Sequence, residues 1–104
     1  MKMIWAVIRP EVVDQVVKAL GAGGFSAMTR FDVYGRGKQK GVMVGGENYD
    51  MPKTVLMLVV ESDSVSAVVK TIEESARTGS IGDGRVFVAP IEEAYTIRTG
   101  DPGL

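Results

Sequence analysis

Two segments rich in glycine and basic residues contain the side chains most suited to bind a ligand. The first, residues 35–41, reads Gly-Arg-Gly-Lys-Gln-Lys-Gly, and the second, residues 78–85, reads Thr-Gly-Ser-Ile-Gly-Asp-Gly-Arg. Glycine lets backbone N–H groups approach a ligand closely, and adjacent cations attract negative charge, as a polyphosphate site requires. A third basic piece, residues 97–100 (Ile-Arg-Thr-Gly), lies near the C-terminus. Only folding could bring the three segments together.

The composition restricts the other chemistry. A chain of 104 residues has the length of one domain, so we treat 1–104 as a single domain. The net charge of −1 gives no general attraction to nucleic acid or to anionic lipid, so an anion site must be local. The chain has no cysteine and no histidine, which excludes disulfides, thiolate zinc sites and histidine-assisted catalysis.

Targeting signals are also missing from the sequence. The longest apolar run, residues 55–60, is far shorter than the ~18 residues that indicate a membrane span. Arg9 and Pro10 follow the apolar N-terminus too closely for a signal-peptide core. We therefore expect a cytoplasmic protein without membrane insertion and without nucleic acid as a partner.

Hydrophobic periodicity predicts the element order β-α-β-β-α-β. Strands are expected at residues 1–9, 26–34, 53–61 and 85–89, with amphipathic helices from Pro10 to residue 20 and from Ser62 or Asp63 to residue 76. Residues 35–52 form a long loop, residues 78–84 a shorter one, and the tail has weak strand signals at 94–98. This order is that of an α+β, ferredoxin-like sandwich with an antiparallel sheet and both helices on one face.

Both faces of this sheet are apolar. Alternation in the first and third strands gives one set containing Ile4, Ala6, Ile8, Leu56, Leu58 and Val60, and an opposite set containing Met3, Trp5, Val7, Val55, Met57 and Val59. Two short helices can cover only one face, and each Å² of apolar area left in water forfeits about 25 cal/mol. We therefore expect a closed homo-oligomer in which the bare sheet faces pack together.

The sequence resembles the PII signal-transduction proteins (nitrogen regulatory protein P-II) over nearly its whole length. The resemblance is most specific in residues 76–88, and it extends to residues 37–41, 97–100 and the pair Pro52-Lys53. It implies a non-enzymatic trimer of ferredoxin-like subunits with nucleotide in the clefts between them. ATP and ADP would compete there, and 2-oxoglutarate would bind beside MgATP. Residues 35–52 would be the effector loop, 78–85 the phosphate loop and 95–104 a C-terminal segment.

The resemblance also assigns site residues. The nucleotide site that it implies comprises Thr29, Gly37, Lys38, Gln39, Val59, Thr78, Gly82, Asp83, Gly84, Arg85 and Arg98. In it, backbone amides of residues 82–84 would hold phosphates, and Arg85, Arg98 and Lys38 would neutralise them. The 2-oxoglutarate site that it implies comprises Gln39, Lys40, Gly41 and Lys53, with a ligand carboxylate on Lys53. Gln39 would bind Mg²⁺ through its side-chain oxygen.

Some features depart from the family pattern or point to one branch of it. Tyr49 lies only three residues before Pro52, so we do not expect a modification site there. Thr96 stands where the family commonly has an arginine. Residues 34–41 and the shortened long loop resemble the nitrogenase-associated branch, whose members act as paired paralogues. This implies a homotrimer, or a hetero-oligomer with a PII paralogue, whose target is the dinitrogenase component of nitrogenase.

Simpler interpretations stay open beside this one. Residues 82–85 could be a tight turn, and Asp83 could bond its own backbone there. Arg36, Lys38 and Lys40 could form a solvated basic loop. The chain could instead be a general PII regulator of ammonium transport or glutamine synthetase. It could also be a ferredoxin-like RNA-binding module, although the third strand lacks the aromatic residues that such modules use. A small nucleotide hydrolase is a further alternative.

Overall fold

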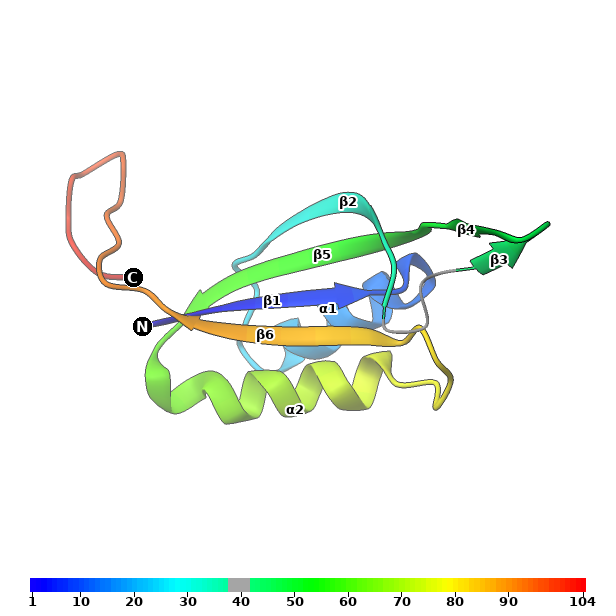
Figure 1. Cartoon of the computed structure of the whole chain (residues 1–104). Helices are drawn as coiled ribbons and strands as arrows, with labels where there is room; N and C mark the ends of the chain where they lie inside the picture. Colours follow the sequence, from blue (N-terminus) through cyan, green and yellow to red (C-terminus); the bar gives the residue numbers. More distant parts are fainter. Residues whose placement is uncertain (38–41) are drawn as a thin grey trace.

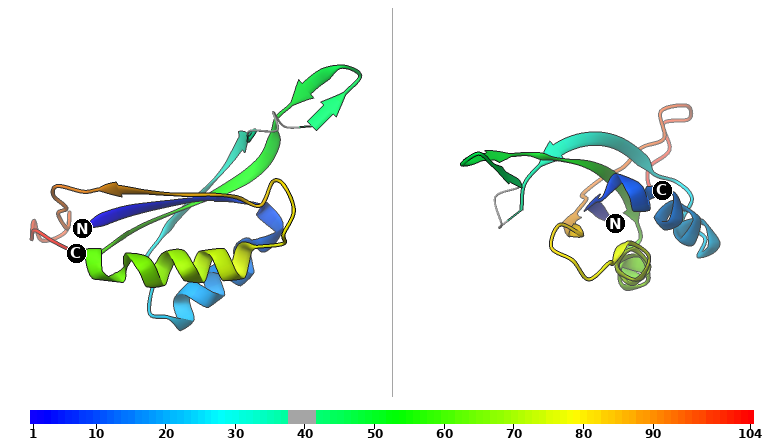
Figure 2. Two further views of the ribbon diagram at one scale, coloured as in Figure 1. Left: turned by 60° about the horizontal axis from the view of Figure 1, so that its bottom comes forward. Right: turned by 90° about the vertical axis from the view of Figure 1, so that its right-hand side faces the viewer.

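The computed structural model describes residues 1–37 and 42–104 (Figure 1). Its four-stranded antiparallel sheet has the strand order β2-β5-β1-β6. Both helices cover one face of this sheet (Figure 2). The elements are β1 (Lys2–Ile8), a 3₁₀ turn (Pro10–Val12), α1 (Val13–Ala22), β2 (Thr29–Gly35), β3 (Val42–Val44), β4 (Glu47–Tyr49), β5 (Met51–Val60), a second 3₁₀ turn (Ser62–Ser64), α2 (Val65–Ala76) and β6 (Gly84–Pro90). The predicted α+β, ferredoxin-like fold is confirmed.

The core lies between the helices and one face of the central strands. Ile4 of β1 pairs with Leu58 of β5, and both side chains are almost completely buried. The helices contribute the other wall of this core, through Leu20 of α1 and Ile72 of α2. The predicted alternation is therefore correct, because every second residue of β1 and β5 faces the helices.

Both helices begin later than the sequence patterns predicted. Pro10, expected as the first helical residue, starts a 3₁₀ turn, and α1 begins at Val13. Ser62 and Asp63, expected as caps, lie in the second 3₁₀ turn, and neither caps α2 with its side chain. In both turns backbone i→i+3 bonds satisfy the N–H groups that a capping side chain would otherwise have bonded, which removes the need for a cap.

The connection between β2 and β5 contains structure that the sequence analysis treated as loop. Residues 42–49 form a β3–β4 hairpin, which projects beyond the end of the main sheet (Figure 1). Gly45 and Gly46 form its turn with φ of 58° and 83°, as a two-residue hairpin turn requires. Each strand has only three residues, too few to show a periodicity. At the base of the connection, Arg36 Nε lies 2.5 Å from Asp50 Oδ1.

The weak strand signals at residues 94–98 do not correspond to a strand. The C-terminal segment instead folds back on itself, with a single bridge between Tyr95 and Pro102. Its reversal is closed by backbone bonds from Thr96 N–H to Asp101 O (2.9 Å) and from Gly100 N–H to Thr96 O (2.7 Å). Because the segment bonds to itself, it adds no strand to the main sheet.

The second face of the sheet is apolar and is not covered by either helix. It carries Met3, Trp5, Val7, Phe31, Val55, Met57, Val59 and Phe87. The rings of Trp5 and Phe31 meet edge to face, with centroids 5.7 Å apart, and Phe87 is 55% exposed. The buried indole N–H of Trp5 has no acceptor within the described residues. The predicted bare face is thus present, and its coverage by other subunits stays a prediction.

No helix in the described part of the chain is long and apolar enough to cross a membrane.

Candidate nucleotide and effector site

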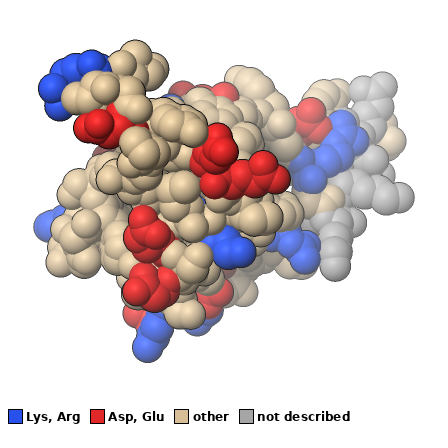
Figure 3. Space-filling model, turned by 90° about the vertical axis from the view of Figure 1, so that its left-hand side faces the viewer, with Lys and Arg blue, Asp and Glu red and all other residues tan. Residues whose placement is uncertain are grey.

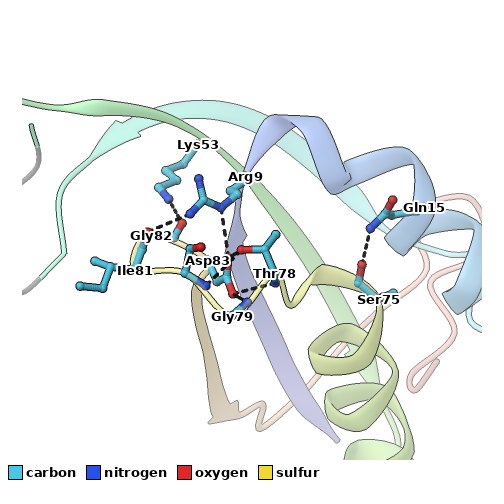
Figure 4. Close-up of polar contacts among 10 residues, drawn as sticks. Arg9, Gln15, Lys53, Ser75, Thr78, Gly79, Ile81, Gly82 and Asp83 are labelled. Atoms are coloured by element: carbon cyan, nitrogen blue, oxygen red, sulfur yellow. Dashed lines mark hydrogen bonds and ion pairs between the residues drawn. The ribbon is translucent and has the colours of Figure 1, made fainter.

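The predicted phosphate loop, residues 78–85, joins α2 to β6 and is organised around the side chain of Asp83. The carboxylate accepts hydrogen bonds from the backbone N–H of Thr78 (2.8 Å) and of Gly79 (2.9 Å), and from the Thr78 hydroxyl (Figure 4). These donors, the hydroxyl first, hold the pKa of Asp83 well below its ordinary range. Asp83 therefore shapes the loop, as the simpler interpretation expected. Its hydrogen-bond donors are not its own backbone, however, but Thr78 and Gly79 at the start of the loop.

Arg9 connects this loop to the end of β1. Its Nε lies 3.1 Å from Asp83 Oδ1, and its Nη2 donates to the carbonyl of Ile81 at 2.8 Å (Figure 4). Arg9 and Asp83 are 74 positions apart, and they meet because β1 and β6 pair with Ile8 opposite Gly84. Sequence analysis missed Arg9, since it lies outside every glycine-rich segment. The strand pairing was the only signal that could have found it.

Lys53 of β5 approaches the same loop and donates a hydrogen bond to the carbonyl of Gly82. Burial and, after it, the charge of Arg9 lower the pKa of Lys53, whereas Glu11 and Asp83 act in the opposite direction. An ideal Cβ on Gly82 would lie 3.2 Å from Arg9 Nη2 and 3.8 Å from Lys53 Nζ. Two cations therefore converge beside the Gly82 backbone, where the carboxylates of Asp83 and Glu11 partly compensate them.

Gly84 is required by the backbone geometry at the start of β6. Its φ is 112°, and a Cβ at this position would lie 1.8 Å from the carbonyl oxygen of Val7. No side chain fits there without displacement of β1. Gly82 also has positive φ, 98°, and the N–H of Asp83 closes a turn onto Ser80 O at 3.3 Å. A tight turn is thus present, but it spans Ser80 to Asp83 and not residues 82–85, since Gly84 and Arg85 already belong to β6.

The structure divides the predicted site residues between the two ends of the sheet. One end gathers Lys53, Thr78, Gly82, Asp83, Gly84 and Arg85, and Gly37 follows β2 at this end. Thr29, paired with Met57, and Val59, paired with Met3, lie toward the other end. Val59 lies six positions after Lys53 in β5, which corresponds to roughly 20 Å along the strand. Lys38, Gln39, Lys40 and Gly41 lie outside the described residues.

Arg98 also belongs to the second end, beyond the last residue of β6. Figure 3 views the molecule from this end and shows basic and acidic side chains mixed over the face, with a basic side chain on the projecting C-terminal segment. Exposed carboxylates of this region include Glu61, Glu92 and Glu93. Neither Arg85 nor Arg98 forms an ion pair with any residue of 1–37 or 42–104. Within those residues both arginines therefore remain available to an anion.

A cavity of about 320 Å³ lies between α2 and β6, next to the phosphate loop. Its walls include Ile72, Ala76 and Val86, which are apolar. Glu73 and Arg77 at its rim form an ion pair of 3.6 Å. Asp83, Gly84 and Arg85 also line the cavity, so its walls are partly apolar and partly charged, whereas Arg9 and Lys53 are not among its lining residues.

The fold and the site define the class of protein: a ferredoxin-like α+β domain with a glycine-rich, cation-bearing loop at the end of its sheet. The family model described as nitrogen regulatory protein P-II matches residues 1–101, and the chain belongs to this family. Members of the family are regulatory signal-transduction proteins.

Curated relatives agree with this assignment. The chain is 52% identical to the nitrogen fixation nifHD1 region GlnB-like protein 1 of Methanosarcina barkeri, and 53% identical to the nitrogen fixation nifHD region glnB-like protein 1 of Methanococcus maripaludis. Both comparisons cover 100% of each chain. It is 44% identical to nitrogen regulatory protein P-II 2 of Methanothermobacter thermautotrophicus, over 99% of this chain and 94% of the relative. The similarity therefore extends over the whole domain, and two of these relatives carry nitrogen fixation in their names.

Proposed function

We propose that this protein is a nitrogen regulator that senses ATP or ADP together with 2-oxoglutarate and controls a target protein through residues 35–52. The observation that carries the proposal is the meeting of Lys53, Arg9 and the Gly82–Gly84 backbone at one end of the sheet. The same end holds the base of the 35–52 connection, where Gly35 pairs with Met51. A ligand bound there would contact the connection directly, and a ligand that prefers one loop conformation shifts its population.

The nucleotide would bind between two subunits. One subunit would supply the phosphate loop with Arg85, together with Lys38. The neighbour would supply Thr29 and Val59 near the base, and Arg98 near the phosphates. The separation of roughly 20 Å along β5 supports this division. Each end of the sheet carries only part of the proposed site, so the two parts would have to come from different chains. The uncovered apolar sheet face supplies the contact area for a homotrimer, or for a hetero-oligomer with a PII paralogue.

The residues present fit an anionic effector. The carboxylate of Asp83 pairs with Arg9, and Glu11 acts on Lys53 only through its charge, so Lys53 has no ion-pair partner within 1–37 and 42–104. Lys53 would exchange the Gly82 carbonyl for a carboxylate of 2-oxoglutarate, with the backbone of residues 40 and 41 assisting. Gln39 would supply an oxygen to Mg²⁺, and phosphate and 2-oxoglutarate oxygens would complete its shell.

Calorimetric titration tests the sensing function. We expect MgATP to bind the oligomer, and 2-oxoglutarate to release binding heat only when MgATP is present. The Lys53→Met variant should lose the 2-oxoglutarate heat, whereas the matched Lys18→Met variant, at an exposed position of α1, should keep it. Well-folded protein that shows no heat with ATP, ADP or 2-oxoglutarate would refute the proposal.

The target is the dinitrogenase component of nitrogenase, by analogy with the nitrogen-fixation names of the relatives. We expect the protein to inhibit purified nitrogenase and 2-oxoglutarate with MgATP to relieve the inhibition. If the protein does not inhibit nitrogenase but binds an ammonium transporter or glutamine synthetase in a nucleotide-dependent way, the general PII role applies instead. A salt-sensitive RNA gel shift without a nucleotide effect would assign the RNA-binding alternative.

A further inference from the structure

The Asp83 carboxylate is 23% exposed, and both of its oxygens accept hydrogen bonds from the protein. All its described partners are donors from the protein: the Thr78 hydroxyl, two backbone N–H groups and the Arg9 guanidinium. A carboxylate offers about four lone-pair positions, so these four donors occupy its accepting capacity. The group is therefore not poised to bind a metal ion or a ligand hydroxyl.

The same contacts fix the two ends of the loop to each other. Bonds from Thr78 and Gly79 to Asp83 bring residues four and five positions apart into contact, and they close the loop across its base. Arg9 then attaches this closed loop to β1 through both the carboxylate and the Ile81 carbonyl. Exposed glycine-rich backbone has a high conformational entropy, which these bonds remove before any ligand arrives.

We propose that Asp83 is a positioning residue: with Arg9 and Thr78 it holds the backbone of residues 78–84 in the conformation that receives phosphate, without touching the ligand. This proposal rests on the proposed nucleotide-binding function. It assigns the side chain a role different from the backbone amide of the same residue, which the phosphates would contact. It also explains how a carboxylate can lie beside an anion site, because Arg9 neutralises it at 3.1 Å.

Two measurements on Asp83→Asn test the proposal. Amide hydrogen exchange, followed by NMR, reports whether Thr78 and Gly79 lose their protection, and calorimetry reports the affinity for MgATP. We expect faster exchange at both amides and at least about tenfold weaker ATP binding, because each charge-assisted hydrogen bond contributes on the order of a decade in an equilibrium constant. Asp63→Asn, at an exposed position of the second 3₁₀ turn, is the matched control and should change neither value.

Substitutions at the donors keep the test decisive if Asp83→Asn folds poorly. Thr78→Ser retains the hydroxyl donor to Asp83 and should keep the Gly79 amide protected from exchange, whereas Thr78→Val removes this donor and should make that amide exchange faster. Arg9→Gln combined with Asp83→Asn should weaken binding by less than the product of the two single effects, since each single variant already disrupts the contact that Arg9 and Asp83 share. A purely structural role elsewhere would not produce this rescue and this non-additivity.

The outcomes separate the two proposals. Faster exchange with unchanged ATP affinity, or unchanged exchange at Thr78 and Gly79, would overturn the positioning role of Asp83. Wild-type protein that binds no ATP would overturn the proposed function itself. Exchange rates would then still decide whether Asp83 holds the loop, so the two failures remain distinguishable.

Discussion

Replacement of Gly84 by alanine should be among the most damaging single changes in this chain. The new Cβ would lie 1.8 Å from the Val7 carbonyl oxygen, where an ordinary contact is at least 3.4 Å, so the atoms would have to separate by 3.4 − 1.8 = 1.6 Å. That displacement acts on the pairing of Ile8 with Gly84, the contact that brings β6 beside β1. A residue with a side chain at φ of 112° adds backbone strain to the clash.

The two terms give the magnitude. Backbone strain costs about 1–2 kcal/mol and forced displacement in a packed region about 1–3 kcal/mol, so the free energy of unfolding should fall by about 2–5 kcal/mol. For a small domain with an m-value of about 1.5 kcal/mol per molar urea, a loss of 3 kcal/mol moves the midpoint by about 2 M. Urea denaturation at one fixed subunit concentration measures it, since oligomer stability depends on concentration.

Two glycines serve as controls for the separate terms. Gly24, two residues after the end of α1, has φ of 91° and nothing within 4 Å of an added Cβ, so Gly24→Ala reports the backbone term alone, about 1 kcal/mol. Gly35 has open space and no left-handed φ, so Gly35→Ala should change stability by less than about 0.5 kcal/mol. If Gly84→Ala is no less stable than Gly24→Ala, the proposed steric requirement at β6 is refuted.

Two further predictions concern the open sheet face and the acid behaviour of the phosphate loop. Phe87→Glu should convert the oligomer to monomers in sedimentation experiments, whereas Val88→Glu, 46% exposed on the opposite face of β6, should not; equal behaviour of the two variants would contradict the proposed interface. The pKa of Asp83 is lowered in the folded protein, so its contribution to stability is complete above its ordinary pKa of 3.8 and is lost only as the pH falls below that value. The difference in unfolding free energy between wild type and Asp83→Asn should therefore stay constant from neutral pH to about pH 4 and shrink below it; a difference that already closes near pH 5 would show that Asp83 is not stabilised in its charged form.

The alternation of apolar residues was sufficient to predict the sheet and its two faces. Ile4 and Trp5 have opposite environments because neighbouring residues of a strand point to opposite faces, and this period needs no tertiary information. Helix starts were less predictable, because backbone bonds of the 3₁₀ turns replaced the side-chain caps that Ser62 and Asp63 suggested. The β3–β4 hairpin was missed for another reason, since its strands are too short to carry a pattern.

The candidate site was predictable only in its local parts. Glycine positions indicated the turn before β6, and the structure shows why Gly84 must be a glycine. Arg9 could not be found from local sequence, because its contact with Asp83 depends on the register of β1 against β6. The direction of the Asp83 side chain depends likewise on where α2 ends, since Thr78 and Gly79 supply the donors.

The placement of Lys53 and Val59 at opposite ends of β5 determines how defects would combine in mixed assemblies. In the proposed ring, each crevice takes one end from each of two adjoining chains. A chain with a substitution at Lys53 would keep the Arg98 end functional, and a chain with a substitution at Arg98 would keep the Lys53 end functional. Wherever the two intact ends adjoin, complementation would restore a working crevice, although each variant alone has none. Ligand stoichiometry would then report which chains are neighbours, and two paralogues could divide sensing between them.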